Sequence, residues 1–156
     1  FLKDEKIINL GNRKVLIKNI GEAHSAGDII VYDFNTKTYF SGDVVFKERA
    51  AAFSDSNIKK WLKKINLKFD KEWDYMIPGH GSLIFNKSGL DDTVNWLNYL
   101  DNQINKAVEQ GDLLAEILDY PIPKNILHLK LIKETMRQGI KNQLVKYNLK
   151  KLLNKN

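Results

Sequence analysis

The apolar residues of this 156-residue chain change their spacing near residue 54, and this change limits the folds that the chain can adopt. Before it, short runs rich in valine, isoleucine and aromatic residues are typical of β-strands. The polar stretches GNR and NTK divide these runs, so we expect two hairpins, over residues 5–21 and 28–43. A β-rich half followed by a helical tail favours half of a layered sandwich over a complete doubly wound sheet.

Beyond residue 54 the spacing becomes helical. The first helical segment places four apolar residues at intervals of three or four: Ile58, Trp61, Leu62 and Ile65. The stretch EWDYMI predicts one more strand that runs into Pro78, and the final helical stretch is expected from Asn125 onward, in one or two pieces divided at Gly139. We therefore predict one mixed α/β (α+β) domain, with a β-rich part over residues 1–86 and a helical tail over residues 87–156.

The formal net charge of +6 raises the question of a nucleic-acid partner. Only three of the 25 basic residues are arginines, the residue type favoured for bidentate phosphate and base contacts. The C-terminal lysines are interpreted as a solvated helix face: Lys141, Lys146, Lys150, Lys151 and Lys155. We therefore expect no nucleic-acid partner, and a basic nucleic-acid-binding domain, which salt-sensitive binding would reveal, is the weakest hypothesis.

The sequence lacks cysteine and lacks a long apolar stretch, and both absences limit the kinds of site and partner that the chain can have. The chain contains no cysteine, which excludes disulfides, thiolate zinc sites and a cysteine nucleophile but leaves the compartment open between periplasm and cytoplasm. No stretch approaches the roughly 20 apolar residues of a membrane span, so no membrane partner is expected.

Three polar stretches stand at the ends of expected strands, each with glycine beside it. GEAHSAGD carries His24 and Asp28, YFSGDVVF carries Asp43, and YMIPGHG carries His80. Loops held by rigid strands commonly display ligands, and two imidazoles with a carboxylate suit zinc in the absence of cysteine. Each residue alone also fits an ordinary loop or turn position. Their occurrence together, in these flanks and this order, predicts a metal site.

The series AHSAGDIIVY, YFSGDVVF and YMIPGHG resembles the C-terminal half of the metallo-β-lactamase superfamily, from about residue 5 to about residue 150. The stretch from GDVVF through WLKKI to IPGHG, and the tail RQGIKNQLVKY, are most similar to the branch described as quinoprotein relay system zinc metallohydrolase-like hydrolases. The resemblance implies the C-terminal half of an αβ/βα sandwich with a site for two zinc ions, although iron or manganese suits the same ligand types.

The resemblance also implies residue roles. His24 would bind the first zinc, Asp43 would bridge both ions, and His80 would bind the second. Four further residues would support these ligands: Asp28, Gly27, Gly42 and Gly79. Asp28 would hydrogen-bond to a ligand and orient it, and it fits equally well as an aspartate at the start of a strand.

The implied reaction is metal-assisted hydrolysis of a small molecule. A zinc-bound hydroxide would attack an ester, thioester, amide or lactone, so no catalytic side chain is required. Phe46 stands where β-lactamases of this fold commonly place a lysine, which disfavours β-lactam substrates. Phe46, Arg49 and Phe53 are expected to border the substrate pocket, although Arg49 also fits an exposed loop position. A glyoxalase II-like thioesterase ranks second, because the basic C-terminal arm of those proteins is not recognisable here.

The strongest signature of the superfamily, the run His-x-His-x-Asp-His, is missing from this chain. The third histidine, His128, is interpreted as a packing or surface residue because apolar residues surround it. One hypothesis, which the start at Phe1 supports, is a hydrolase fragment that is inactive alone and self-associates through the face left open by the absent N-terminal half of the fold. The other is a natural short protein that serves as a non-catalytic binding or assembly module. A ligand run encoded upstream in frame would favour the first, and a start codon directly before Phe1 the second.

Overall fold

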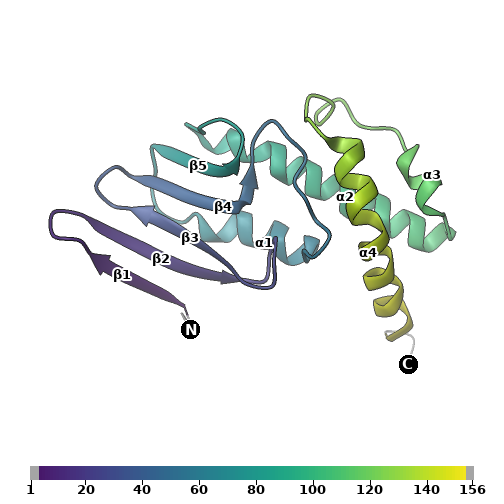
Figure 1. Cartoon of the computed structure of the whole chain (residues 1–156), viewed down its shortest axis with the longest axis horizontal. Coiled ribbons are helices and arrows are strands. Elements are labelled where there is room, and N and C mark those ends of the chain that lie inside the picture. The colour runs from purple at the N-terminus through teal and green to yellow at the C-terminus, as the bar shows by residue number, and fades with distance from the viewer. Residues whose placement is uncertain (1–3, 154–156) are drawn as a thin grey trace.

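The structure of the chain, a computed structural model, describes residues 4–153, except for the side chains of Asn66 and of residues 150–153. In this part of the chain the strands form one five-stranded sheet in the order β1-β2-β3-β4-β5 (Figure 1). The first four strands pair antiparallel, as the two expected hairpins require: β1 (Glu5–Asn9), β2 (Lys14–Gly21), β3 (Asp28–Asp33) and β4 (Thr38–Phe46). The last strand, β5 (Tyr75–His80), pairs parallel with β4. The predicted mixed α/β fold class is confirmed.

Helix α1 (Ile58–Lys68) connects the parallel strands β4 and β5, as parallel pairing requires a crossover. Asn57 caps the helix, because its side-chain oxygen accepts a hydrogen bond from the Lys60 N–H at 3.1 Å. Trp61 is buried and its indole N–H donates to the carbonyl of Val44 at 2.8 Å. The helix is therefore fixed against the end of β4.

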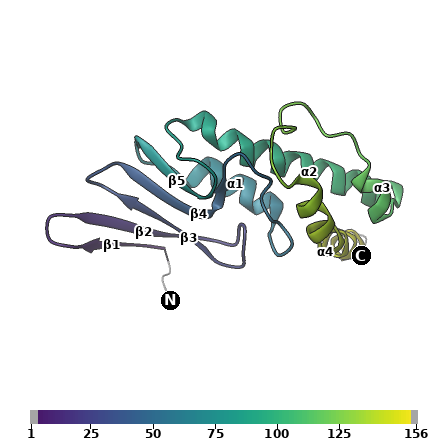
Figure 2. The same ribbon diagram turned by 45° about the horizontal axis from the view of Figure 1, so that its top comes forward.

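The two faces of the sheet are covered differently. One face buries side chains that lie in register across β2, β3, β4 and β5: Leu16, Tyr32, Tyr39 and Met76. This face is covered by α1 and the segment after it, where Phe69 packs edge-on against the Tyr39 ring at 5.1 Å. Figure 2 shows the helices on one side of the sheet. The opposite face, called here the open sheet face, presents apolar side chains that are exposed or only partly buried: Ile17, Ile29, Val31, Phe40, Tyr75 and Ile77.

The chain after β5 is helical, with a short 3-10 turn followed by three helices: η1 (Lys87–Leu90), α2 (Asp91–Gln110), α3 (Leu114–Leu118) and α4 (Ile132–Leu153). The structure differs from the expectation of helix from Asn125 onward, since α4 begins only at Ile132. The helix also continues through Gly139 without a break. Gly139 is required for packing, because a Cβ there would lie 2.6 Å from the ring of Phe53.

The expected solvated lysine face lies on α4. Lys141 and Lys146 are exposed, and the Lys146 ammonium also donates to the carbonyls of Ser54 at 3.2 Å and Ser56 at 3.3 Å. The side chains of Lys150 and Lys151 and the whole of Lys155 lie outside the described residues. Within the described part of the chain, none of the helices has the length and apolar character needed to cross a membrane.

Candidate metal centre

Asp43 and His80 come together near the ends of the parallel strands β4 and β5. His80 is paired in register with Phe46, the last residue of β4. The His80 Nε2 atom lies 3.6 Å from Asp43 Oδ1, and the two side chains are 45% and 43% exposed. Sequence reasoning placed both residues at strand ends from separate motifs, and the parallel pairing of those strands brings them to one place.

Two of the predicted supporting glycines, Gly79 and Gly42, let the Asp43 side chain lie close to the backbone of β5. A Cβ at Gly79 would lie 2.2 Å from Asp43 Oδ1 and 2.7 Å from the backbone of Gly42, so only glycine fits there. Gly42 has a positive φ of 52°, where residues with a side chain are strained, and the β4–β5 register is irregular on both sides of it. Gly27 meets nothing within 4 Å and has no such steric requirement.

His24 reaches the same region through Phe46. The centroid of the His24 ring lies 5.8 Å from that of Phe46 and 5.2 Å from that of Trp61. The centroid of the His80 ring lies 5.0 Å from that of Phe46. One buried aromatic ring therefore contacts both imidazoles. Within residues 4–153, however, three or more potential ligands do not gather closely enough to hold a single ion.

Asp28 supports the loop that carries His24. Its carboxylate accepts hydrogen bonds from the backbone N–H and the hydroxyl of Ser25, both at 2.8 Å. These bonds close a tight turn directly after His24. Asp28 therefore acts on the backbone beside the imidazole and fixes the course of the loop into β3.

The three expected pocket residues lie in different environments. The Arg49 Nη1 atom lies 3.4 Å from His80 Nδ1, a contact that is a hydrogen bond only in the tautomer that carries the imidazole proton on Nε2. Phe46 is buried beneath the two imidazoles. Phe53 faces the core instead of this surface: its ring is buried against Trp96, 6.1 Å between centroids, and against Gly139.

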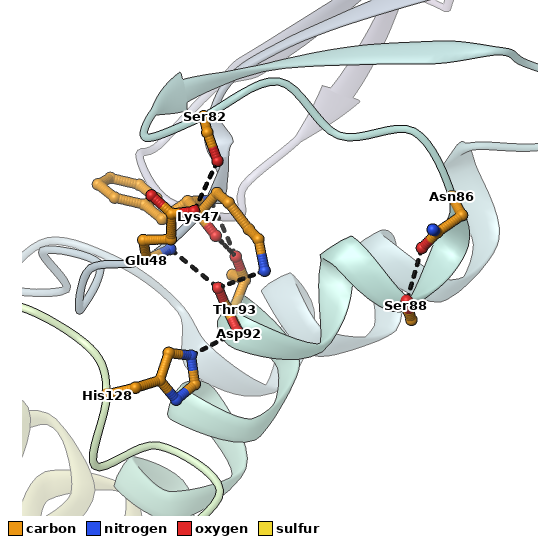
Figure 3. Close-up of polar contacts among 9 residues, drawn as sticks. Lys47, Glu48, Ser82, Asn86, Ser88, Asp92, Thr93 and His128 are labelled. Carbon is orange, nitrogen blue, oxygen red and sulfur yellow. Dashed lines mark hydrogen bonds and ion pairs between the residues drawn. The ribbon is translucent and has the colours of Figure 1, made fainter.

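A polar network around the buried side chains of Asp92 and Thr93, at the start of α2, holds the residues next to the end of β4 (Figure 3). The Asp92 carboxylate accepts hydrogen bonds from the Glu48 N–H at 2.8 Å and pairs with the Lys47 ammonium at 2.9 Å and with His128 Nε2 at 3.0 Å. Burial by itself raises the pKa of Asp92, but the bonds from Glu48, Lys47 and His128 outweigh it and hold this pKa below its ordinary value.

Thr93 adds a second attachment, because its hydroxyl accepts from the Phe46 N–H at 2.9 Å and donates to the Phe46 carbonyl at 2.8 Å. The backbone N–H of Lys47 in turn donates to the His80 carbonyl at 2.8 Å. Asp92 and Thr93 therefore position both the aromatic ring and the strand end that form the site. Sequence reasoning missed them, because an aspartate and a threonine in a first helical turn are common and their partners are distant in sequence.

His128 is a surface histidine, as interpreted from the sequence, with 51% of its side chain exposed. Its bond to Asp92 gives it a structural partner that the apolar residues around it in the sequence did not indicate.

Comparison with known proteins gives matches to solved structures only. No protein-family model and no curated protein matches the sequence. A metallo-β-lactamase from Pontibacter korlensis is 20% identical over 62% of this chain and 47% of its own, with a TM-score of 0.54. The metallo-β-lactamase IND-7 is 24% identical over 63% of this chain and 47% of its own, with a TM-score of 0.54. A double mutant of the sec-alkyl sulfatase PisA1 is 14% identical over 92% of this chain and 26% of its own, with a TM-score of 0.71.

These likenesses concern the fold. The chain spans about half the length of the lactamases that it matches and about a quarter of the sulfatase. The sulfatase match covers so much of this chain that it includes most of the helical tail, whereas the lactamase matches leave more than a third of the chain uncovered. The prediction of a partial metallo-β-lactamase fold, made from three short motifs, is confirmed.

Proposed function

We propose that this chain is part of a metal-dependent hydrolase in which His24, Asp43 and His80 contribute to a site for two zinc ions. The observation that carries the proposal is the approach of Asp43 and His80 to 3.6 Å at the end of a parallel strand pair, with His24 on the same Phe46 ring. The neighbours in fold, named as lactamases and a sulfatase, are hydrolases by name and act on different substrates. They support the kind of reaction and leave the substrate open.

The residues present fit a metal ion chemically. Within residues 4–153 the Asp43 carboxylate accepts no hydrogen bond from another residue. His80 Nε2 lies beside it and is a nitrogen donor in the tautomer that carries the proton on Nδ1. Carboxylate and imidazole are ligands of zinc, and also of iron and manganese. Asp43 has two oxygens and is therefore suited to contact two ions. When bound, a metal pair would lower the pKa of a water towards neutrality and would polarise a carbonyl.

The chain itself contributes orientation and shape. Gly79 and Gly42 let the Asp43 carboxylate rest against β5, and Phe46 excludes water from the inner side of both imidazoles. We propose a small-molecule ester, thioester, amide or lactone as the substrate. Because the chain lacks the histidine-rich run of such enzymes, we expect the isolated chain to bind metal weakly and to be inactive.

Zinc titration of the metal-free chain by calorimetry tests this proposal. We expect His80→Ala to weaken zinc binding by about tenfold or more, as loss of a ligand or its support typically does. His128→Ala is the matched control, since it removes the other histidine that pairs with an aspartate. No zinc binding above background, or equal loss in both variants, would contradict a metal site built on His80.

The open sheet face favours a second candidate, a non-catalytic assembly module. Contiguous exposed apolar side chains on a sheet commonly mark an association surface. We propose that the isolated chain self-associates through this face into a dimer. Light scattering across a range of concentrations should show a dimer that Phe40→Lys weakens and Leu127→Lys, an exposed apolar residue in the turn before α4, does not. A wild-type monomer at every concentration would contradict self-association.

A further inference from the structure

Arg49 is held in place beside the metal-ligand pair by two distant parts of the chain. Its backbone forms a parallel bridge with Lys130, in which the Ala50 N–H donates to the Lys130 carbonyl at 2.9 Å and the Lys130 N–H donates to the Glu48 carbonyl at 3.1 Å. The preceding residues are fixed by Asp92 and Thr93 at the start of α2. The Arg49 side chain therefore extends from a constrained backbone, and its Nη1 atom reaches His80 Nδ1 at 3.4 Å.

Among the residues that the structure describes, the guanidinium of Arg49 has no carboxylate partner. Within residues 4–153, no Asp or Glu oxygen lies within 4.0 Å of its nitrogens, and the Nε atom is buried without a hydrogen-bond acceptor. The neighbouring charged groups are engaged elsewhere: Lys47 pairs with Asp92, and Glu48 accepts a hydrogen bond from Ser82 at 2.7 Å. Arg49 is partly buried, and a permanently charged group with an unsatisfied buried donor is costly unless an acceptor binds it.

The chemistry of the missing acceptor follows from the shape of the donor. A guanidinium presents adjacent N–H groups in one plane, which match two oxygens of a carboxylate, sulfate or phosphate. A neutral hydroxyl or amide would satisfy one donor and leave the charge without a counterion.

We propose that Arg49 binds an oxyanion, the charged group of the substrate, directly beside Asp43 and His80. This inference rests on the proposed function. The substrate would be an anionic small molecule: Arg49 would bind its charged end, and its reacting group would face the metal ligands. The binding step itself involves only this chain, so it is measurable without metal.

Inorganic sulfate is the probe, titrated into the metal-free, isotope-labelled chain and followed by NMR, with sodium chloride at equal ionic strength as the reference. We expect saturable shifts at Phe46, Arg49 and His80 with a Kd on the order of 1 mM. A parallel titration with acetate shows whether a carboxylate is preferred over sulfate. Arg49→Lys should weaken binding several-fold, because an ammonium lacks the planar pair of donors.

Arg49→Gln should raise the sulfate Kd about tenfold or more, whereas Arg137→Gln, an equal loss of charge on the exposed face of α4, should leave it unchanged. Absence of saturable wild-type shifts at these residues, or an unchanged Kd in Arg49→Gln, would overturn the proposal. If Arg49→Gln does not fold, the wild-type titration and Arg49→Lys decide. A failed zinc titration would instead count against the metal site, so the two failures are distinguishable.

Discussion

Two histidine–aspartate pairs lie next to residues 46–48, and they differ in how fully the aspartate is satisfied. Asp92 is 8% exposed and lies 3.0 Å from His128 Nε2, with the Glu48 N–H and the Lys47 ammonium as further donors. Asp43 is 43% exposed and lies 3.6 Å from His80 Nε2, with no hydrogen bond to its carboxylate within the described residues. The same two residue types thus occur once as a closed structural network and once as an open pair.

The difference shows which pair is available for a ligand. A carboxylate with about four lone-pair positions that already has three donors, and is buried, gains little from a metal ion and would have to break existing bonds to bind one. The open pair is about half exposed and its carboxylate has no protein donor within the described residues, so it contributes little to stability. The closed network holds residues 46–48 in place, so the rigidity of the first region supports the geometry of the second.

The largest expected effect is the difference in the free energy of unfolding between variants of Asp92 and of Asp43. Asp92→Ala should lower the free energy of unfolding by about 3 kcal/mol, because it leaves the Glu48 N–H and the Lys47 ammonium without their buried partner. Asp43→Ala should change it by less than about 0.5 kcal/mol, as is usual for a half-exposed side chain without strong bonds. Urea unfolding of both variants measures the contrast, and equal losses would show that the open pair is structural too.

A smaller effect on stability is expected from substitution of Gly79, which lies against Asp43. Gly79→Ala should destabilise the chain by about 2 kcal/mol, because its Cβ would collide with the rigid backbone of Gly42 as well as with Asp43. Gly27→Ala is the control, since it meets nothing within 4 Å and should be nearly neutral. Zinc titration of the same two variants tests the metal site separately from stability, and only Gly79→Ala should weaken zinc binding. Comparable behaviour of both variants would argue that the close approach of Gly79 to Asp43 is unimportant.

The sequence predicted the open pair better than the closed one, and the reason is physical. Asp43 and His80 each stand at the end of an apolar run beside glycine, so local pattern alone indicated their place in the fold. No local sequence pattern indicates the role of Asp92. Its partners are 36 to 45 residues away, and its contacts with them form only when α2 packs against the end of β4. Phe53 was misplaced for the same reason: its loop position suggested a pocket, but α4 passes over it, with Gly139 making room for its ring.

The smallest expected effect is the acid dependence of the closed network. Although burial raises it, the pKa of Asp92 is held by its hydrogen bonds below the ordinary value of 3.8. A carboxyl group whose pKa is lowered on folding stabilises the protein above the unfolded value, and this stability is lost as the pH falls through the lower folded value. The free energy of unfolding of the wild type should therefore fall on acidification below pH 3.8.

Asp92→Asn, which cannot ionise, should show a shallower acid dependence than the wild type, although other paired carboxyl groups such as Asp70 still contribute to the remaining slope. Asp91→Asn, an exposed neighbour in the same helical turn, should retain the wild-type slope, which separates the network from a general effect of charge at the start of α2. Unfolding curves in urea at several pH values between neutrality and the acid range provide the slopes. Identical slopes for wild type and Asp92→Asn would mean that Asp92 gains nothing from its donors on folding, and the contrast between the two pairs would then rest on burial alone.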